Sequence, residues 1–186
     1  MSDSTVIGDV TKTLSEILKL QQNPLGSFDV SLNSPADETI EPNRLKINLY
    51  LFRIEENPFA RNRDWQAVGS DVLHRAPLSL NLFYVATPYA TLQEDGHRML
   101  GQAMRILYDN AIIEPPLMSG SLEQTAEPLK VDLCSFNLEE LTRVWNAFNI
   151  AYRLSVCYQV RIVFIDSAIE RSVVRVTEKQ NEHRTN

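Results

Sequence analysis

The sequence contains little of the material from which nucleotide and metal sites are built. Its 186 residues include six glycines, two cysteines and three histidines, and no Walker loop or dinucleotide-binding glycine pattern occurs. No two histidines have the helical spacing of a metal-binding pair. Cys134 and Cys157 are too far apart for a zinc motif, and their apolar neighbours predict buried free thiols; a disulfide would need their Cα atoms within about 7 Å. We therefore expect neither metal nor cofactor.

Long apolar runs and an excess of positive charge are also missing. No apolar run approaches the roughly 20 residues that cross a bilayer, and the polar start Met1–Ser4 does not resemble a signal peptide. Lysine and arginine number 18 against 24 aspartates and glutamates, which gives a formal net charge of -6. This balance argues against nucleic-acid binding. The sequence predicts a protein made in the cytoplasm that does not insert into membranes.

Groups that suggest catalysis have simpler structural interpretations. His97 is the only histidine within a predicted helix, but no partner nucleophile accompanies it. Ser119-Gly120-Ser121 lies in a proline-flanked loop and lacks the flanking glycines of a nucleophile elbow, so a turn is favoured. Glu139 and Glu140 suit the first turn of a helix, where acidic residues interact favourably with the helix dipole. We predict that the chain is not an enzyme.

Three segments have the apolar spacing typical of amphipathic helices. They are 4–22, 91–110 and the stretch that begins at Asn137. Ser4 is the expected N-cap of the first helix. Thr91 is the expected N-cap of the second, with Glu94 as its capping-box partner, and Asn137 with Glu140 form a capping box for the third.

Apolar alternation predicts strands between these helices. They are 28–32, 45–52, 78–86, 131–134, 154–165 and a final edge strand at 173–176. Thr87-Pro88 is expected to end the third strand, and the fifth is expected to alternate without interruption, with Val160 and Val163 on opposite faces. The second face of 45–52 is polar at one end and aromatic at the other, which predicts cover by a helix or by an assembly contact.

The order of these elements predicts the fold class. Helix, strands, helix, strand, helix and strands in succession favour an α+β fold, with helices packed on a mixed sheet. The apolar content of 44% and the length are typical of one folded domain. We expect that domain to span residues 1–177, followed by a polar, mobile tail at 178–186.

The long connection 55–75 is the most distinctive candidate for an interface. Unstructured connections longer than about 12–15 residues are usually functional or disordered, and this one carries Trp65 close to two arginines. Tryptophan and arginine are enriched at binding hot spots, and the final valine-rich strand can pair with another chain by strand addition. The candidate interface residues are Arg61, Asn62, Arg63, Trp65, Val173, Val174 and Val176.

Several segments together resemble a known family. They are Leu78-Ser-Leu-Asn-Leu-Phe-Tyr84 with Tyr89, Asp95-Gly-His-Arg-Met-Leu-Gly-Gln-Ala-Met104, Leu138-Glu-Glu-Leu-Thr-Arg-Val-Trp145 with Tyr152-Arg-Leu-Ser-Val-Cys-Tyr158, and Asn48-Leu-Tyr-Leu51 leading into Arg61-Asn62. Over roughly residues 5–170 the sequence resembles the domain of unknown function in cap, or tube-terminator, proteins of extracellular contractile injection systems. The antifeeding prophage and the virulence-cassette particles are familiar examples. These motifs are packing patterns and contain no catalytic signature.

The resemblance implies a fold similar to phage tail terminators. It also implies a hexameric ring that seals the distal end of the inner tube and engages the last sheath layer. The partners would be further copies of the chain, the tube protein and the sheath protein, and the chain would become part of a phage tail-like particle. Two other functions stay open: a baseplate or adaptor subunit of the same particle, and a small enzyme on an α/β scaffold.

Overall fold

A curled six-stranded mixed sheet forms the centre of the computed structural model, which describes residues 4–22, 27–60, 64–67, 72–125 and 127–172. Its strands in spatial order are β1 (Asp29–Ser31), β2 (Lys46–Glu56), β5 (Leu78–Tyr89), β8 (Val156–Ile165), β7 (Leu129–Leu133) and β6 (Ile112–Ile113). β1 pairs with β2 in parallel, and the other neighbours pair antiparallel. The predicted fold class is therefore confirmed.

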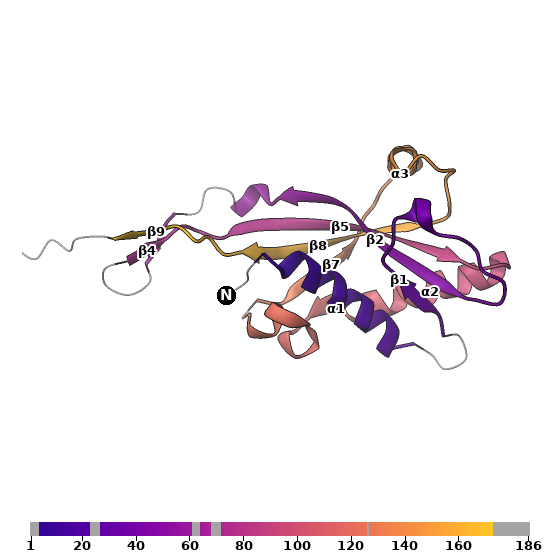
Figure 1. Ribbon diagram of the computed structural model, residues 1–186, viewed down its shortest axis with the longest axis horizontal. Helices are drawn as coiled ribbons and strands as arrows, with labels where there is room; N and C mark the ends of the chain where they lie inside the picture. Colours follow the sequence, from indigo (N-terminus) through magenta and orange to yellow (C-terminus); the bar gives the residue numbers. More distant parts are fainter. Residues whose placement is uncertain (1–3, 23–26, 61–63, 68–71, 126, 173–186) are drawn as a thin grey trace, which may run out of the picture.

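Helices cover both faces of this sheet (Figure 1). α1 (Val6–Leu20) and α2 (Gln93–Asp109) lie on one face, where their apolar stripes join the main core. α3 (Leu138–Ala147) lies on the other face. There Trp145 is fully buried, and its indole N–H donates to the hydroxyl of Ser155 at 3.0 Å. The predicted helical periodicities therefore correspond to real buried faces.

The helix caps were predicted with mixed success. The capping box of α3 is confirmed: Asn137 Oδ1 accepts from the N–H of Glu140 at 2.9 Å, and Glu140 Oε2 accepts from the N–H of Asn137 at 2.8 Å. The predictions of Ser4 and Thr91 as N-caps were wrong. The N-cap of α1 is Thr5, and neither it nor the N-cap of α2 makes a side-chain cap hydrogen bond. The N-cap of α2 is Leu92, which is extended, so Thr91 lies one residue before the cap position.

Two expectations about the long strands were also wrong. β5 does not end at Thr87-Pro88 but continues to Tyr89. Because β8 begins opposite Ala86, one side of β5 has no described strand partner at Pro88, so a residue without an N–H does not break a ladder there. In β8 the register shifts opposite Leu80–Leu82, and this irregularity places Val160 and Val163 in the same core.

The long connection after β2 contains structure that was not predicted. It includes the 3-10 turn η3 (Pro58–Ala60) and the strands β3 (Gln66–Ala67) and β4 (Val72–His74). β4 pairs with β9 (Glu170–Ser172), so β3, β4 and β9 form a second, three-stranded sheet. In Figure 1, β4 and β9 lie beyond the ends of β5 and β8 as a projecting arm. The expectation of an unstructured connection was therefore wrong.

The Ser119-Gly120-Ser121 segment forms a turn that fastens a loop to α1. The N–H and hydroxyl of Ser121 donate to Asp9 Oδ2 at 3.0 and 2.6 Å, and the N–H of Ser119 donates to Thr13 Oγ1 at 2.9 Å. The hydrogen bond from Ser121 is the main reason why the pKa of Asp9 lies below its usual value. Gly120 has φ +66°, and a Cβ there would collide with the Asp9 carboxylate.

Gly120→Ala is expected to lower the free energy of unfolding by roughly 1–3 kcal/mol, because it combines a left-handed backbone with that collision. Gly101→Ala is the matched control. Gly101 lies in α2, and no atom lies within 4 Å of an added Cβ, so this change is expected to stabilise the helix by roughly 0.5–1 kcal/mol. Urea unfolding curves measure both, and equal effects of the two substitutions would contradict the role of Gly120.

Candidate assembly interface

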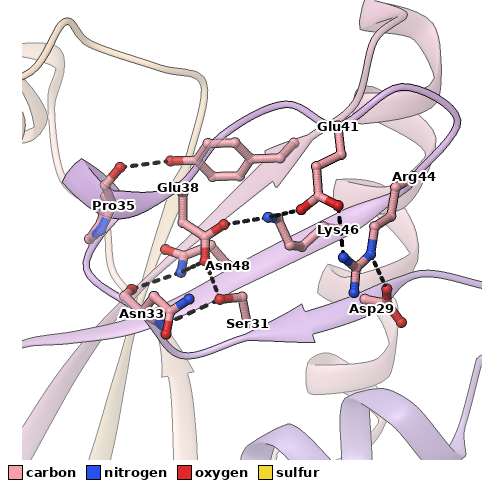
Figure 2. Close-up of polar contacts among 10 residues, drawn as sticks. Asp29, Ser31, Asn33, Pro35, Glu38, Glu41, Arg44, Lys46 and Asn48 are labelled. Atoms are coloured by element: carbon pink, nitrogen blue, oxygen red, sulfur yellow. Dashed lines mark hydrogen bonds and ion pairs between the residues drawn. The ribbon is translucent and has the colours of Figure 1, made fainter.

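A polar cluster holds loop 33–43 against one face of β2 (Figure 2). Lys46 Nζ lies 2.5 Å from Glu38 Oε2, and the two side chains are 10% and 2% exposed. The Ser31 hydroxyl also donates to Glu38, and Asn48 Nδ2 donates to the carbonyl of Asn33 at 2.9 Å. This buried ion pair fixes the loop, because either partner alone would be a desolvated charge.

A second set of charges extends the cluster toward solvent. Glu41 Oε1 lies 3.3 Å from Lys46 Nζ, and Arg44 contacts Glu41 at 2.8 Å and Asp29 at 2.6 Å. Burial would raise the pKa of Glu38, but the hydrogen bonds from Lys46 and Ser31 outweigh it and hold that pKa below the usual 4.5. Glu38 therefore stays ionised at neutral pH.

The two halves of the second face of β2 thus have different covers. Loop 33–43 covers the polar half through the ion pair, whereas the aromatic half meets the C-terminal end of α3. There the ring of Phe148, the C-cap of α3, lies 5.6 Å from the ring of Tyr50 and edge to face. The predicted cover by a helix therefore applies to the aromatic end only. The polar half is closed within the chain by a loop.

Chemically reactive groups are not gathered in the described part of the chain. Among those residues no group of three or more histidine, cysteine, aspartate or glutamate side chains could hold a metal ion, and no helix is long and apolar enough to span a membrane. His97 is exposed. Cys134 donates its N–H to the carbonyl of Cys157 at 2.8 Å; both thiols are free, and burial raises their pKa values to about 11 and 12.

The predicted interface residues are only partly described. Trp65 precedes β3 and is 39% exposed. Arg61, Asn62, Arg63, Val173, Val174 and Val176, like the predicted tail 178–186, lie outside the described residues. β9 directly precedes the three valines, and its residues are exposed on the outer side of the arm.

Two exposed aromatics were missed by the sequence reasoning. Phe59, in η3, is 97% exposed, and Tyr108, near the end of α2, is 82% exposed. Tyr108 lies within the predicted helix 91–110 but was not assigned to its apolar stripe, and its position four residues after Met104, at the border of that stripe, was the available signal. No periodicity marks Phe59, because it lies in a short turn after Asn57-Pro58.

Comparison with known proteins assigns the family. The family described as the Pvc16 N-terminal domain matches residues 9–179. The chain belongs to this family. The predicted resemblance is therefore confirmed, and the match covers both the central sheet and the arm of this Pvc16 N-terminal domain. No curated protein matches the sequence.

Solved structures share the fold of this Pvc16 N-terminal domain. One is the sheath/tube terminator of the extracellular contractile injection system PVC in its extended state, with a TM-score of 0.72 and 18% identity over 100% of this chain. Another is the tube-terminating cap of the anti-feeding prophage, with a TM-score of 0.66 and 17% identity over 95% of this chain. The chain spans 65% and 61% of the length of these two proteins.

Glu38→Gln tests the buried ion pair of this Pvc16 N-terminal domain. At pH 7 we expect the substitution to lower the free energy of unfolding by about 3 kcal/mol, because Lys46 loses its buried partner. The folded-state pKa of Glu38 is lowered, so its stabilisation is fully present above pH 4.5 and is lost as the pH falls through that lower value. The difference between wild type and variant should therefore shrink in acid.

Guanidinium unfolding at pH 7 and at about pH 3 measures this difference. Glu139→Gln is the control, since Glu139 pairs with Arg143 at the surface and its loss is expected to change stability by less than about 1 kcal/mol. If Glu38→Gln lowers the free energy of unfolding equally at both pH values, the shape of the Glu38 side chain, and not its charge, holds the loop.

Proposed function

We propose that this chain is a structural cap that closes the distal end of a contractile, phage tail-like injection particle. The observation that supports the proposal is the likeness of fold over the whole chain to a sheath/tube terminator and to a tube-terminating cap. The family match over residues 9–179 supports it independently of the structural comparison. In this role the protein acts by its shape and its contacts.

A cap must match the last layer of a tube with one face and offer a poor template for growth on the other. Copies arranged around the tube need side-by-side contacts between two different patches, because such heterologous contacts close into a ring by rotation. We infer a hexameric ring whose partners are the inner tube protein and the sheath protein. Its assembly in the cytoplasm would precede its incorporation into the particle.

The arm is the proposed contact with neighbouring proteins. It projects beyond the central sheet (Figure 1), and within the described residues no strand pairs with the outer edge of β9. Unpaired strand edges accept further strands by main-chain hydrogen bonding. We assign Val173, Val174 and Val176 to strand addition with the sheath protein, and the segment from Arg61 to Trp65 to a contact with the tube or with a neighbouring subunit.

Growth of tubes in the presence of the purified chain tests the cap. We expect tube protein to form shorter tubes, each with a ring at one end, because a covered end cannot add further layers. Negative-stain electron microscopy measures the length distribution with and without the chain. A gold-labelled tag on the subunit in whole particles gives the control for position: label at the baseplate end would replace the cap with the adaptor alternative.

The same assay tests the two contacts assigned to the arm. An Arg61→Glu, Arg63→Glu double variant is expected to lose ring formation or length control, because it reverses two charges in a contact segment. A chain that ends at Ser172 is expected to cap tubes but to lose sheath attachment. Normal tube length with the double variant would remove the first assignment, and normal sheath attachment after the truncation would remove the second.

A further inference from the structure

We propose that Phe59 of one copy inserts into an apolar groove at the opposite edge of the sheet in a second copy. This inference rests on the proposed ring and names the contact that would close it. Phe59 and Tyr108, the latter in the groove, are at least 82% exposed. Large aromatic side chains are enriched in the buried centres of interfaces.

Phe59 is presented by a turn that hydrogen bonds anchor to β5. The N–H of Asn57 donates to the carbonyl of Ser79 in β5 at 2.8 Å, and the N–H of Ala60 donates to the carbonyl of Asn57 at 3.1 Å. Asn57 Oδ1 also accepts from the N–H of Phe59 at 3.1 Å, and Ala60 is buried beneath the turn. Binding therefore requires little further ordering of the backbone at Phe59, which reduces the entropic cost of association.

The groove lies between the second half of α2 and the strands β7 and β8. Its volume is about 390 Å³, which is within the range of pockets that hold small ligands. Its apolar lining consists of Met104, Leu107, Tyr108, Val131, Leu133 and Tyr158. A phenyl ring is the kind of side chain that such a lining accepts, because its burial removes apolar surface of both partners from water.

The two features lie at opposite edges of the six-stranded sheet. β1 pairs only with residues 46–48 of β2, so the half of β2 that leads to Phe59 has no described strand on its outer side. At the other edge β6 pairs only with Leu129 and Lys130 of β7, so Leu133 beside the groove has no outer strand among the residues that the structure describes. With Phe59 at one edge and the groove at the other, the contact between two copies is head-to-tail, and contacts of this type can close into a ring.

Charges of opposite sign lie beside the two features. Glu56 directly precedes the turn that carries Phe59, whereas Glu55 pairs with Arg53 within the chain. Arg105 lines the groove, is exposed, and takes part in no ion pair within the described part of the chain. Opposite charges at the rim orient the partners. Phe59, the groove and the charges beside them all belong to this chain. This favours a second copy, and not a tube or sheath protein, as the partner that occupies the groove.

A photo-cross-linking amino acid tests the contact in assembled rings. p-Benzoylphenylalanine replaces Phe59 in an isotopically heavy chain, which is mixed with the unmodified light chain and tube protein. We expect adducts that join position 59 of the heavy chain to peptides 104–108 or 131–133 of the light chain, identified by mass spectrometry. Adducts with tube protein only, or with other peptides of the light chain, would overturn the proposal.

Matched alanine variants give a second, independent measurement. Phe59→Ala and Tyr108→Ala are each expected to raise the dissociation constant between subunits roughly 30-fold, the effect of losing a hot spot. Leu20→Ala is the control, because Leu20 is 82% exposed on α1 and outside both features. Sedimentation measures association, and circular dichroism confirms that each variant folds.

The outcomes separate the contact from the cap. If Phe59→Ala forms rings and limits tube length as well as Leu20→Ala does, the proposed contact of Phe59 with the groove is wrong, and the proposed cap function is unaffected. If the wild-type chain neither associates nor limits tube length, the proposed function fails and this contact fails with it. Loss of association in both aromatic variants, with the Leu20 variant unaffected, supports the contact.

Discussion

β5 is buried on both faces over nearly its whole length, and a strand in that position needs cover above and below it. It also lies between β2 and β8, the two other long strands, so backbone pairing satisfies both of its edges as far as Ala86. α1 and α2 cover one face, and α3 with loop 33–43 covers the other. The ion pair between Lys46 and Glu38 contributes to this cover, because it holds loop 33–43 in place.

The sequence predicted those elements whose signal is local. Apolar periodicity located the helices, and the capping box at Asn137 was recognised because its partners are three residues apart. The continuation of β5 through Pro88 depends on where β8 begins, and the irregularity that places Val163 in the core depends on the pairing register. Neither can be read from one strand alone. The arm was missed because β4 pairs with β9, a partner far away in the sequence.

Among the candidate surfaces, too, the sequence predicted what depends on neighbouring residues and missed what depends on residues far apart in the chain. Trp65 was recognised from its neighbours in the chain, whereas the importance of Phe59 depends on its exposure in a turn that is anchored to β5. The groove beside Tyr108 combines residues from α2, β7 and β8, so no single segment predicts it. The family was predicted because several packing motifs occur together in one order. Such a combination can identify a family even when the sequence contains no catalytic signature.

The two links between the arm and the central sheet have a mechanical consequence. β4 leads into β5, and β8 leads into β9, so the links continue two adjacent strands at the centre of the sheet. Hydrogen bonds in an antiparallel ladder are perpendicular to the strands. A force that pulls the arm along this axis therefore acts on β5 and β8 together, because both links leave from the same end of this antiparallel pair. It loads in shear the ladders that join β5 to β2 and β8 to β7, so that the bonds of each ladder resist together and are not peeled apart one after another.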